Sequence, residues 1–263
     1  MRRLTGKTIV VIGGTTGLGL SAAEAFVREE ARVVVVGRNP QNAEAASLTL
    51  GNNGVAVVGD ATDSTTAPRA IVTAKERFGT FDGLYHVAGG SGRRMGDGPL
   101  HDLTDDGLQG TMELNFNSLV YSNRAAVRAF LENRTPGSIL NMSSVLGFFP
   151  SPRHFATHAY AAAKAAIVGF SKAIAAYYAT DDIRVNVVAP ALVETPMSER
   201  ATLDDKIRKF ISTKQPLDGG RIGRPQDLDE AAIYFMSDGS KFTTGQVLMV
   251  DGGWTVSEGQ YGK

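Results

Sequence analysis

The chain has 263 residues, 43% of them hydrophobic and 21% charged, with 27 basic and 27 acidic side chains and no cysteine. This composition excludes a disordered chain, and the zero net charge excludes a general attraction to nucleic acid or to an anionic membrane. The absence of cysteine excludes disulfides, thiolate nucleophiles and cysteine-based metal sites. One excess is informative, since 30 residues are glycine, about 11% against an average near 7%. Glycine is costly in regular elements, so these residues are expected where the backbone turns tightly or a ligand approaches closely.

The sequence contains no segment typical of secretion or membrane insertion. The apolar stretch Ile9–Ile12 near the N-terminus ends at Gly13 and is too short for a signal sequence. No apolar run approaches the roughly 20 residues needed to span a bilayer. We therefore expect a cytoplasmic protein with neither a membrane nor a nucleic acid as its partner.

Short β-branched runs alternate with longer amphipathic segments along the whole chain. In chain order, strands are predicted at Thr8–Ile12, Arg32–Val36, Val55–Val58, Gly83–Val87, Ser138–Met142, Arg184–Val188 and Gln246–Val250. Between them, helices are predicted at Gly17–Glu29, Gln41–Leu50, Thr66–Arg77, Thr104–Leu131, Tyr160–Ala179 and Gln226–Ser237. This alternation predicts an α/β fold, namely a doubly wound parallel sheet with helices on both faces.

No linker or repeat interrupts this pattern, so a single domain is predicted over residues 1–263. Residues 190–224 fit the pattern poorly, because they contain Pro196 and Pro216 on either side of a short charged helix near Leu203–Lys214. A long insertion of this kind in a compact domain is often a lid over an active site. We therefore expect residues 190–224 to form a substrate lid.

The first predicted strand leads directly into a glycine-rich turn, Gly13-Gly14-Thr15-Thr16-Gly17-Leu18-Gly19, and then into the first helix. Gly13 permits the tight turn, Gly17 allows a pyrophosphate to approach, and Gly19 allows close packing of helix on strand. The amino end of the helix supplies free N–H groups for phosphate oxygens. The turn therefore predicts a dinucleotide site that is also lined by Thr15, Thr16 and Leu18.

The residue that contacts the adenosine ribose is expected about 20 residues after the turn, at the end of the second strand. That place holds Gly37 and Arg38 and no carboxylate. A carboxylate would bind the ribose 2′-hydroxyl of NAD and repel a 2′-phosphate, whereas a guanidinium offers a fork for the phosphate. We therefore expect a preference for NADP(H), with NAD(H) as the alternative if Arg38 is only a solvated residue after a strand.

Tyr160 and Lys164 are spaced one helical turn apart, so both side chains lie on one face of the predicted helix. An ammonium about 5 Å from a phenol contributes roughly 3 kcal/mol at an effective dielectric constant near 20. This energy is equivalent to about 2.4 pKa units and is expected to bring the tyrosine pKa from about 10 towards neutrality, as would a nearby cationic nicotinamide. Tyr160 is then able to exchange a proton with an alcohol or carbonyl oxygen while the cofactor transfers a hydride.

These motifs occur in the order found in the short-chain dehydrogenase/reductases, which the chain resembles over nearly its whole length. The resemblance also includes Gly59-Asp60-Ala61-Thr62, Ala88-Gly89, Asn115, the serine motif Asn141–Gly147 with Ser144, Pro190–Thr195 and Gly245–Gly253. It implies a Rossmann fold with a seven-stranded parallel sheet and, commonly, a homotetramer, with a dimer as the alternative. Within the family, the chain resembles members that reduce 3-oxoacyl thioesters.

The resemblance also implies a role for each matching residue. Tyr160 is the acid/base, and Ser144 orients the substrate carbonyl. Lys164 binds the nicotinamide ribose, Asn115 holds a water molecule of a proton relay, and Asp60 contacts the adenine. Further cofactor contacts fall on Ala61, Ala88, Gly89, Pro190, Val193 and Thr195.

Four departures from the family pattern are apparent. His86 and Val87 stand where the family usually has two asparagines, so a sheet-stabilising amide contact is expected to be missing. Ile12 replaces a frequent threonine, Ala191 replaces a glycine, and the interval from Ser144 to Tyr160 is a few residues longer than is typical. None of these changes removes a catalytic group, but they leave the substrate and the loop geometry open.

Two further features lie outside the motifs. His154 and His158 have a spacing that would suit zinc on a helix, but the neighbouring prolines indicate a loop and no acidic third ligand is adjacent. No metal is therefore predicted, and His154 is expected with Phe155 on the wall of the substrate pocket. Arg93 and Arg94 either contact an anionic substrate or are solvated loop residues.

The sequence as a whole predicts an NADP(H)-dependent oxidoreductase that interconverts a ketone and a secondary alcohol. The small-molecule substrate is reduced or oxidised by hydride transfer, with Tyr160 exchanging the proton. The alternatives within the family are reduction of a 3-oxoacyl thioester and NAD-linked oxidation of a polyol, sugar or steroid. The alternative outside enzymes is a nucleotide-sensing protein on the same fold, although such proteins usually lose the tyrosine or the lysine.

Overall fold

The apolar runs that were predicted as strands all join one sheet in the computed structural model, which describes residues 2–259. The strands are β1 (Thr8–Ile12), β2 (Arg32–Gly37), β3 (Gly54–Val58), β4 (Gly83–His86), β5 (Gly137–Met142), β6 (Ile183–Pro190) and β7 (Val247–Val250). Their order across the sheet is β3-β2-β1-β4-β5-β6-β7, and every neighbouring pair is parallel. The predicted doubly wound sheet of seven parallel strands is therefore confirmed.

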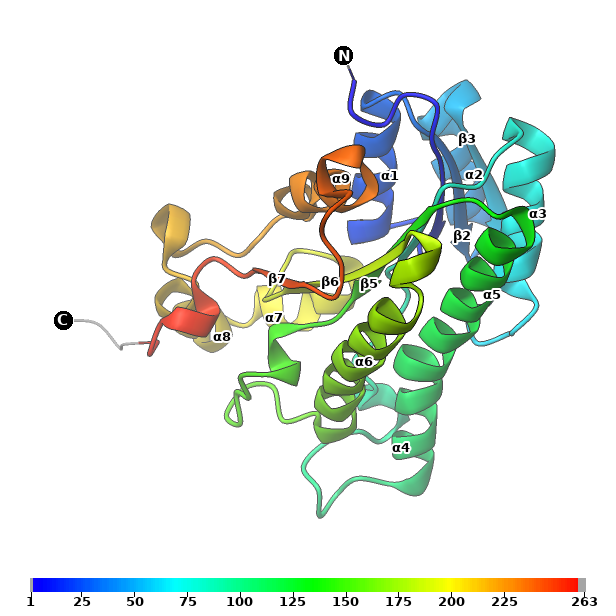
Figure 1. Ribbon diagram of the computed structural model, residues 1–263. Coiled ribbons are helices and arrows are strands. Elements are labelled where there is room, and N and C mark those ends of the chain that lie inside the picture. Colours follow the sequence, from blue (N-terminus) through cyan, green and yellow to red (C-terminus); the bar gives the residue numbers. More distant parts are fainter. Residues whose placement is uncertain (1, 260–263) are drawn as a thin grey trace.

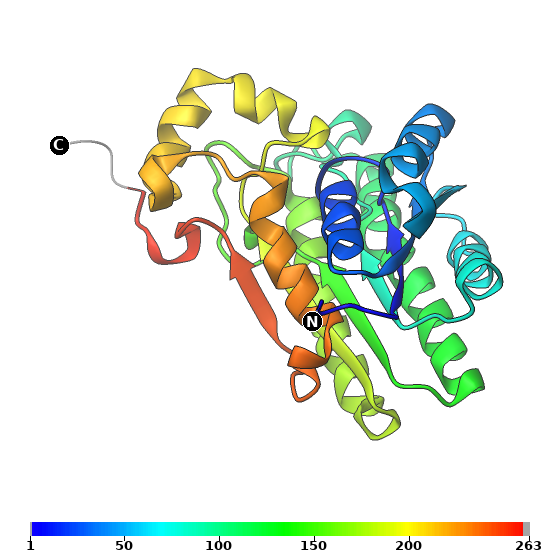
Figure 2. The ribbon, with the colours of Figure 1, turned by 90° about the horizontal axis from the view of Figure 1, so that it is seen from above.

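Helices cover both faces of this sheet, as Figures 1 and 2 show. One face carries α1 (Gly17–Arg28), α2 (Pro40–Leu50) and α9 (Asp229–Met236), and the other carries α3 (Thr66–Phe78), α5 (Ser118–Asn133) and α6 (His158–Tyr177). The remaining helices are α4 (Asp105–Met112), α7 (Glu199–Leu203) and α8 (Asp205–Lys214). The helices lie within one or a few residues of the predicted segments, with two exceptions: the segment predicted as one helix from 104 to 131 is interrupted, and α7 was not predicted.

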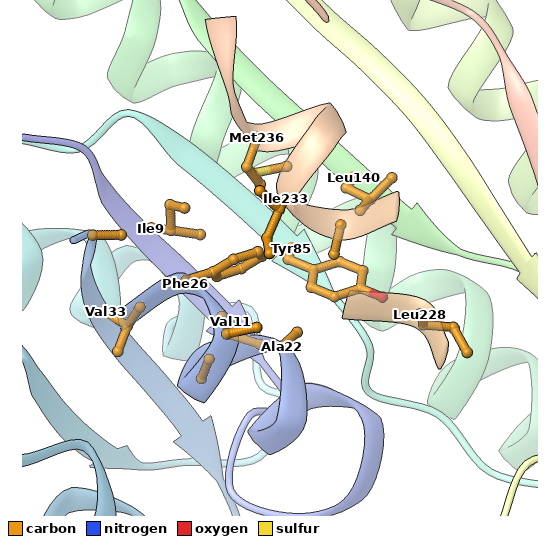
Figure 3. Close-up of a cluster of buried hydrophobic side chains, with 14 of the residues drawn as sticks. Ile9, Val11, Ala22, Phe26, Val33, Tyr85, Leu140, Leu228, Ile233 and Met236 are labelled. Carbon is orange, nitrogen blue, oxygen red and sulfur yellow. The ribbon is translucent and has the colours of Figure 1, made fainter. Parts of the chain in front are cut away.

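The continuous apolar strands are explained by the two cores that they fill. Successive side chains of a strand point to opposite faces, so Val33 and Val35 of β2 lie in the core beneath α1 and α9, whereas Val34 and Val36 lie in the core beneath α3 and α5. Figure 3 shows the first core, where Phe26 of α1 meets Tyr85 of β4, with their ring centroids 6.3 Å apart. Burial on both faces makes the sheet a rigid support for the loops at its edges.

Residues 190–224 leave the sheet after β6 and return to it before α9. Backbone hydrogen bonds from Glu194 N to Gly223 O and from Gly223 N to Leu192 O close the base of the segment. Between these points lie α7 and α8, which pack with Trp254 in a third apolar cluster near the C-terminal end of the described chain (Figure 1). The assignments of a single domain and of a lid that moves both stay predictions.

Helix α6 is apolar enough to resemble a membrane span, with a mean hydropathy of 1.2 over an 18-residue window. From the sequence we expected no apolar run of this length. The helix nevertheless buries Tyr160, Lys164 and Ile167 inside the protein, and 44% of the window is buried. We interpret α6 as a core helix. The cytoplasmic location stays a prediction.

Candidate active site

The parallel sheet brings the carboxyl ends of its strands to one edge, and the predicted site residues gather there. In open α/β sheets a ligand binds beyond this edge at the point where the strand order reverses, which here lies between β1 and β4. Three cavities adjoin at this point, and we call them the long groove, the inner cavity and the outer cavity. Their volumes are about 670, 100 and 120 Å³ respectively.

The long groove runs over the ends of β1 and β2. It is lined by most of the residues predicted to contact a dinucleotide, namely Gly13, Thr15, Thr16, Gly17, Leu18, Arg38, Asp60, Ala61, Ala88, Gly89 and Thr195. Among the turn residues predicted to contact the cofactor, Gly19 is the exception. A Cβ atom at Gly19 would lie 2.2 Å from Gly13 O, so this glycine allows helix α1 to pack on the turn and does not itself line the groove.

The backbone of the turn requires glycine at Gly13. Its φ of +83° lies in the left-handed region, and an added Cβ would lie 2.7 Å from the backbone nitrogen of Ala88. The turn therefore lies close against the end of β4, and helix α1 begins at the floor of the groove. Thr16, the N-cap of α1, makes no side-chain capping hydrogen bond, so the first N–H groups of the helix remain available to an anion.

Arg38 and Asp60 lie beside each other at the end of the long groove. The side chain of Arg38 is 69% exposed, and its Nη1 lies 3.8 Å from Asp60 Oδ2. Asp60 Oδ1 accepts hydrogen bonds from the backbone N–H and the hydroxyl of Thr62. An exposed pair of this kind contributes little to stability, so Arg38 is held only loosely and is free to meet a ligand.

The inner cavity is the meeting point of the tyrosine, the lysine and the loop after β6. It is lined by Ser143, Ser144, Tyr160, Lys164, Pro190, Val193 and Thr195, among others. Lys164 is 3% exposed, and its ammonium donates a hydrogen bond to Met142 O at 3.0 Å. The same Nζ lies 5.4 Å from the centroid of the Tyr160 ring, which confirms that the two side chains share one face of α6.

The expected lowering of the tyrosine pKa does not occur in the chain alone. Burial raises the pKa of Tyr160 to about 12, and a hydrogen bond with the Ser144 hydroxyl only partly opposes this rise. Burial also lowers the pKa of Lys164 to about 8. The prediction that the ammonium brings Tyr160 towards neutrality was wrong for the isolated chain, because the cost of removing the phenolate from water outweighs the opposing hydrogen bond with Ser144.

Asn115 lies in a π-helical segment, Glu113–Asn117, between α4 and α5. This segment interrupts the helix that was predicted as continuous, and π-bulges are often found at functional sites. The Asn115 side chain donates to Gly90 O and Thr111 O and accepts from Gly90 N. It is fully buried and lines none of the three cavities, but it lies directly behind Gly89, where an added Cβ would approach both Asn115 Oδ1 and Lys164 Nζ.

Comparisons with known proteins agree with this geometry. A family model described as "Enoyl-(Acyl carrier protein) reductase" matches residues 12–255. A 3-oxoacyl-(acyl-carrier-protein) reductase from Chlamydia trachomatis is 33% identical over 254 residues, which cover 95% of this chain and 98% of the relative. An NADP-dependent (R)-specific alcohol dehydrogenase from Lentilactobacillus kefiri is also 33% identical, over 96% of this chain and 98% of the relative.

A solved structure shows the same fold. A short-chain type dehydrogenase/reductase from Mycobacterium ulcerans matches with a TM-score of 0.88 and 27% identity, covering 97% of this chain and 92% of that chain. The chain belongs to the short-chain dehydrogenase/reductase family. It is an NAD(P)-dependent oxidoreductase that acts on alcohols and carbonyl compounds. At about this level of identity the relatives differ in their substrates, so the substrate of this short-chain dehydrogenase/reductase does not follow from them.

The departure at His86 is compensated within the fold. His86 is buried at the end of β4, where its Nδ1 lies 2.8 Å from Ser122 Oγ and its Nε2 lies 3.4 Å from Ser118 Oγ. Burial and the positive charge of Lys164 lower the pKa of His86 to about 3. A reciprocal amide pair between Asn123 and Asn141 ties α5 to β5. The amide contact that the sequence led us to expect missing is indeed not made from position 86, and the His86 imidazole contacts two hydroxyls of α5 in its place.

Sequence reasoning missed Asp97, which holds the start of helix α6. Asp97 is 5% exposed, and its two carboxylate oxygens accept hydrogen bonds from the N–H groups of Ala159 and Tyr160. Thr157, the N-cap of α6, makes no side-chain capping bond of its own. The cap comes instead from a loop 62 residues away in the sequence, and no local sequence signal indicates it.

The outer cavity extends from Ser144 and Tyr160 towards the segment 190–224. Its walls are largely apolar and include Leu146, Phe155, Leu192, Met197 and Trp254, but Arg93 and Arg200 also line it. Phe155 is therefore a wall residue as predicted. His154 is not, because its ring packs on Phe210 with the centroids 4.7 Å apart. Arg94 is exposed and does not line the cavity.

Proposed function

We propose that this enzyme interconverts a small ketone and its secondary alcohol with NADP(H). The observation that carries the proposal is that Ser144 and Tyr160 line both the inner and the outer cavity. A carbonyl oxygen at this junction would meet two hydroxyl groups, while the rest of the substrate would occupy the apolar outer cavity. A bound reduced nicotinamide supplies the hydride, so that the ketone, NADPH and a proton give the alcohol and NADP⁺.

The roles of the side chains follow from their contacts. The Ser144 hydroxyl holds the substrate oxygen, and the Tyr160 phenol, which is protonated at neutral pH, donates its proton to that oxygen. The Lys164 ammonium uses one of its three donors on Met142 O, which leaves two for the hydroxyls of a nicotinamide ribose. Asn115 lies directly behind Gly89, and the family resemblance supports a role for it in holding a water molecule of the proton relay.

The long groove fits a dinucleotide on the evidence of its own geometry. The glycine turn leaves room where a Cβ would clash, and the uncapped start of α1 offers N–H groups to a pyrophosphate. We propose contacts to the adenosine half from Arg38, Asp60 and Ala61, and contacts to the nicotinamide half from Ala88, Gly89, Pro190, Val193 and Thr195.

Replacing Tyr160 tests the reaction. The Tyr160→Phe variant removes the proton donor and keeps the ring, so kcat on a ketone substrate is expected to fall by about 10²–10⁴-fold. NADPH binding should be retained. Tyr177→Phe, at the exposed end of the same helix, is the control and should keep native turnover. A Tyr160→Phe variant with full turnover would overturn the proposed mechanism.

The substrate used in this test would first be found by following NADPH oxidation with ketones, quinones, sugars and acyl thioesters.

The preference for NADP(H) is tested at Arg38. Fluorescence titration of the native protein should give tighter binding of NADPH than of NADH. The Arg38→Ala variant should bind NADPH about 10–100-fold more weakly, because a hydrogen-bonded charge contact is lost, and should bind NADH as before. Tighter binding of NADH by the native protein would reject the preference.

Reduction of a 3-oxoacyl thioester is the second candidate. It is supported by the relative from Chlamydia trachomatis, which carries that activity in its name.

We also propose a homotetramer, as is common in the family. The single chain leaves large apolar side chains such as Phe242 and Tyr177 exposed, and a second copy would cover such groups.

A further inference from the structure

Two arginines from separate elements face the outer cavity. Arg93 comes from the loop after β4 and is half-buried, and Arg200 comes from α7 in the segment 190–224. Neither forms an ion pair within residues 2–259. Asp97 interacts electrostatically with Arg93, and Asp204 interacts electrostatically with Arg200.

Asp97 and Asp204 are already used as helix caps. Asp97 accepts from the first turn of α6, and Asp204 accepts from Lys206 N and Ile207 N at the start of α8. Arg93 itself makes a single long hydrogen bond, 3.4 Å, to His154 O. The two guanidiniums therefore keep most of their donors available.

The two arginines also act on each other. Burial lowers the pKa of Arg93, and the like charge of Arg200 lowers it further, with Asp97 opposing. Two cations at the wall of one apolar cavity are unfavourable unless an anion joins them. A guanidinium is suited to this task, because its planar fork binds a carboxylate or phosphate through two hydrogen bonds.

The neighbouring wall also contains an unused donor. Trp254 is 1% exposed, and its Nε1 has no hydrogen-bond partner among the described residues. Buried donors without a partner are rare in folded proteins. Trp254 lines the same cavity as the two arginines, and no carboxylate is among the residues that line it.

We propose that the substrate carries an anionic oxygen group, a carboxylate or a similar oxyanion, and that Arg93 and Arg200 bind it in the outer cavity. That the substrate also carries a reacting carbonyl group is an inference that rests on the function proposed above, in which Ser144 and Tyr160 of the same cavity bind the carbonyl oxygen. The anion site does not depend on that function. With a cavity of about 120 Å³, the anionic group and the carbonyl belong to one small molecule, and the substrate class is a small oxo acid or the corresponding hydroxy acid.

The test compares each acid with its own uncharged ester. The substrates are 2-oxopentanoate, 4-oxopentanoate and 5-oxohexanoate, each beside its methyl ester, and 2-oxopropylphosphonate beside its dimethyl ester. The native enzyme, with NADPH or NADH, is expected to show a kcat/KM at least ten-fold higher for the acid of one or more pairs. The carboxylate and phosphonate arms show which oxyanion the site prefers.

Variants locate the preference. Arg93→Gln and Arg200→Gln should each lower the ratio of acid to ester by about ten-fold or more. Because the ratio is taken within one protein, a general loss of activity cancels. Arg94→Gln, the exposed neighbour outside the cavity, is the matched control and should keep the native ratio. An unchanged ratio in both cavity variants would overturn the proposal even if the native enzyme prefers acids.

A binding measurement separates this proposal from the proposed function. The same acids and esters are titrated calorimetrically into the native protein in the presence of NADP⁺. If acid and ester are turned over equally and bind equally, or if neither binds, the anion site is overturned. Ketone reduction would then be tested separately by the wider screen of carbonyl compounds. Acid-selective binding without turnover of any compound would support the anion site and reject the proposed reaction.

Discussion

His86, Tyr160 and Lys164 show how burial sets the resting state of this site. Each is buried, and the low-dielectric surroundings disfavour whichever form carries a charge. The pKa of Tyr160 is raised to about 12, whereas burial lowers the pKa of His86 to about 3 and that of Lys164 to about 8. At neutral pH the phenol therefore holds its proton, which suits it to donate to a carbonyl oxygen in the direction of reduction.

His86 is expected to make the fold sensitive to acid. Its pKa of about 3 in the folded chain lies below the ordinary value of 6.5, so below pH 6.5 the unfolded chain takes up a proton that the folded chain does not. The stabilisation is complete above pH 6.5 and is lost as the pH falls towards 3, by about 1.4 kcal/mol per pH unit. Urea unfolding of the native protein at pH 7, 6 and 5 measures this slope.

The control for this prediction is His86→Asn, which introduces the side chain that the family usually has. Between pH 6 and 5 the native protein should lose about 1.2 kcal/mol more than the variant. Asp229 also titrates in this range, because burial raises its pKa to about 6, and its protonation stabilises the folded chain as the pH falls. This contribution to the free energy of unfolding is the same in both proteins, so it cancels in the comparison. Equal slopes for the two proteins would contradict the prediction.

At the scale of elements, helix α6 depends on a cap that another loop supplies. The two oxygens of Asp97 satisfy the N–H groups of Ala159 and Tyr160, and Arg93 lies four residues before Asp97 in the same loop. The carboxylate thus connects the loop after β4 to the helix that carries the tyrosine and the lysine. A shift of either element would move Tyr160 relative to the outer cavity.

Removing this cap should destabilise the protein. Asp97→Ala leaves two buried N–H groups without an acceptor, and the free energy of unfolding is expected to fall by about 1–3 kcal/mol. Asp102→Ala, in the same region but with a side chain that is 69% exposed, should change it by less than about 0.5 kcal/mol. Chemical denaturation checks both. Equal effects of the two variants would show that Asp97 is not the cap that matters.

The glycine turn is the other element whose shape is set by close contact. Gly13→Ala places a Cβ in left-handed backbone and 2.7 Å from Ala88 N, so stability is expected to fall by about 1–3 kcal/mol. In the native protein, NADPH at 100 times its Kd should add about 2.7 kcal/mol to the free energy of unfolding and raise the melting temperature. In Gly13→Ala this rise should disappear. Gly98→Ala, where no atom lies within 4 Å of the added Cβ, should keep the NADPH effect. A Gly13→Ala variant with the native response would argue against a dinucleotide at this turn.

At the scale of the whole molecule, the long groove, inner cavity and outer cavity form one continuous cleft. Thr195 and Met197 line both the long groove and the inner cavity, while Ser144 and Tyr160 line both the inner and the outer cavity. Met197 lines all three. The segment 190–224 thus borders the whole cleft, so its movement would affect cofactor and substrate together.

The assembly of the whole molecule is also testable. We expect the chains to associate because association would cover apolar side chains that the single chain exposes. A homotetramer should give a mass of four times 27.9 kDa by light scattering. Dilution should lower the melting temperature if the subunits stabilise one another. A single species of 27.9 kDa at all concentrations would reject the assembly.

The sequence alone determined the sheet, the glycine turn and the tyrosine–lysine pair. Runs such as Val33–Val36 are apolar throughout because they fill a core on each face, and this pattern is visible without coordinates. Glycine spacing and the interval between Tyr160 and Lys164 are likewise local properties. Local patterns specify local geometry, and the parallel order of the strands then brings their ends together.

Only the tertiary structure decided the features that depend on residues far apart in the chain. The tertiary structure alone shows that Asp97 caps α6, that Asn115 lies in a π-helical segment and that Arg93 and Arg200 line one cavity. The pKa of Tyr160 was mispredicted for the same reason, since the charge of Lys164 is evident from spacing but burial is not. Burial and long-range contact arise only when separate elements pack, and they decide which side chains the cleft presents to a substrate.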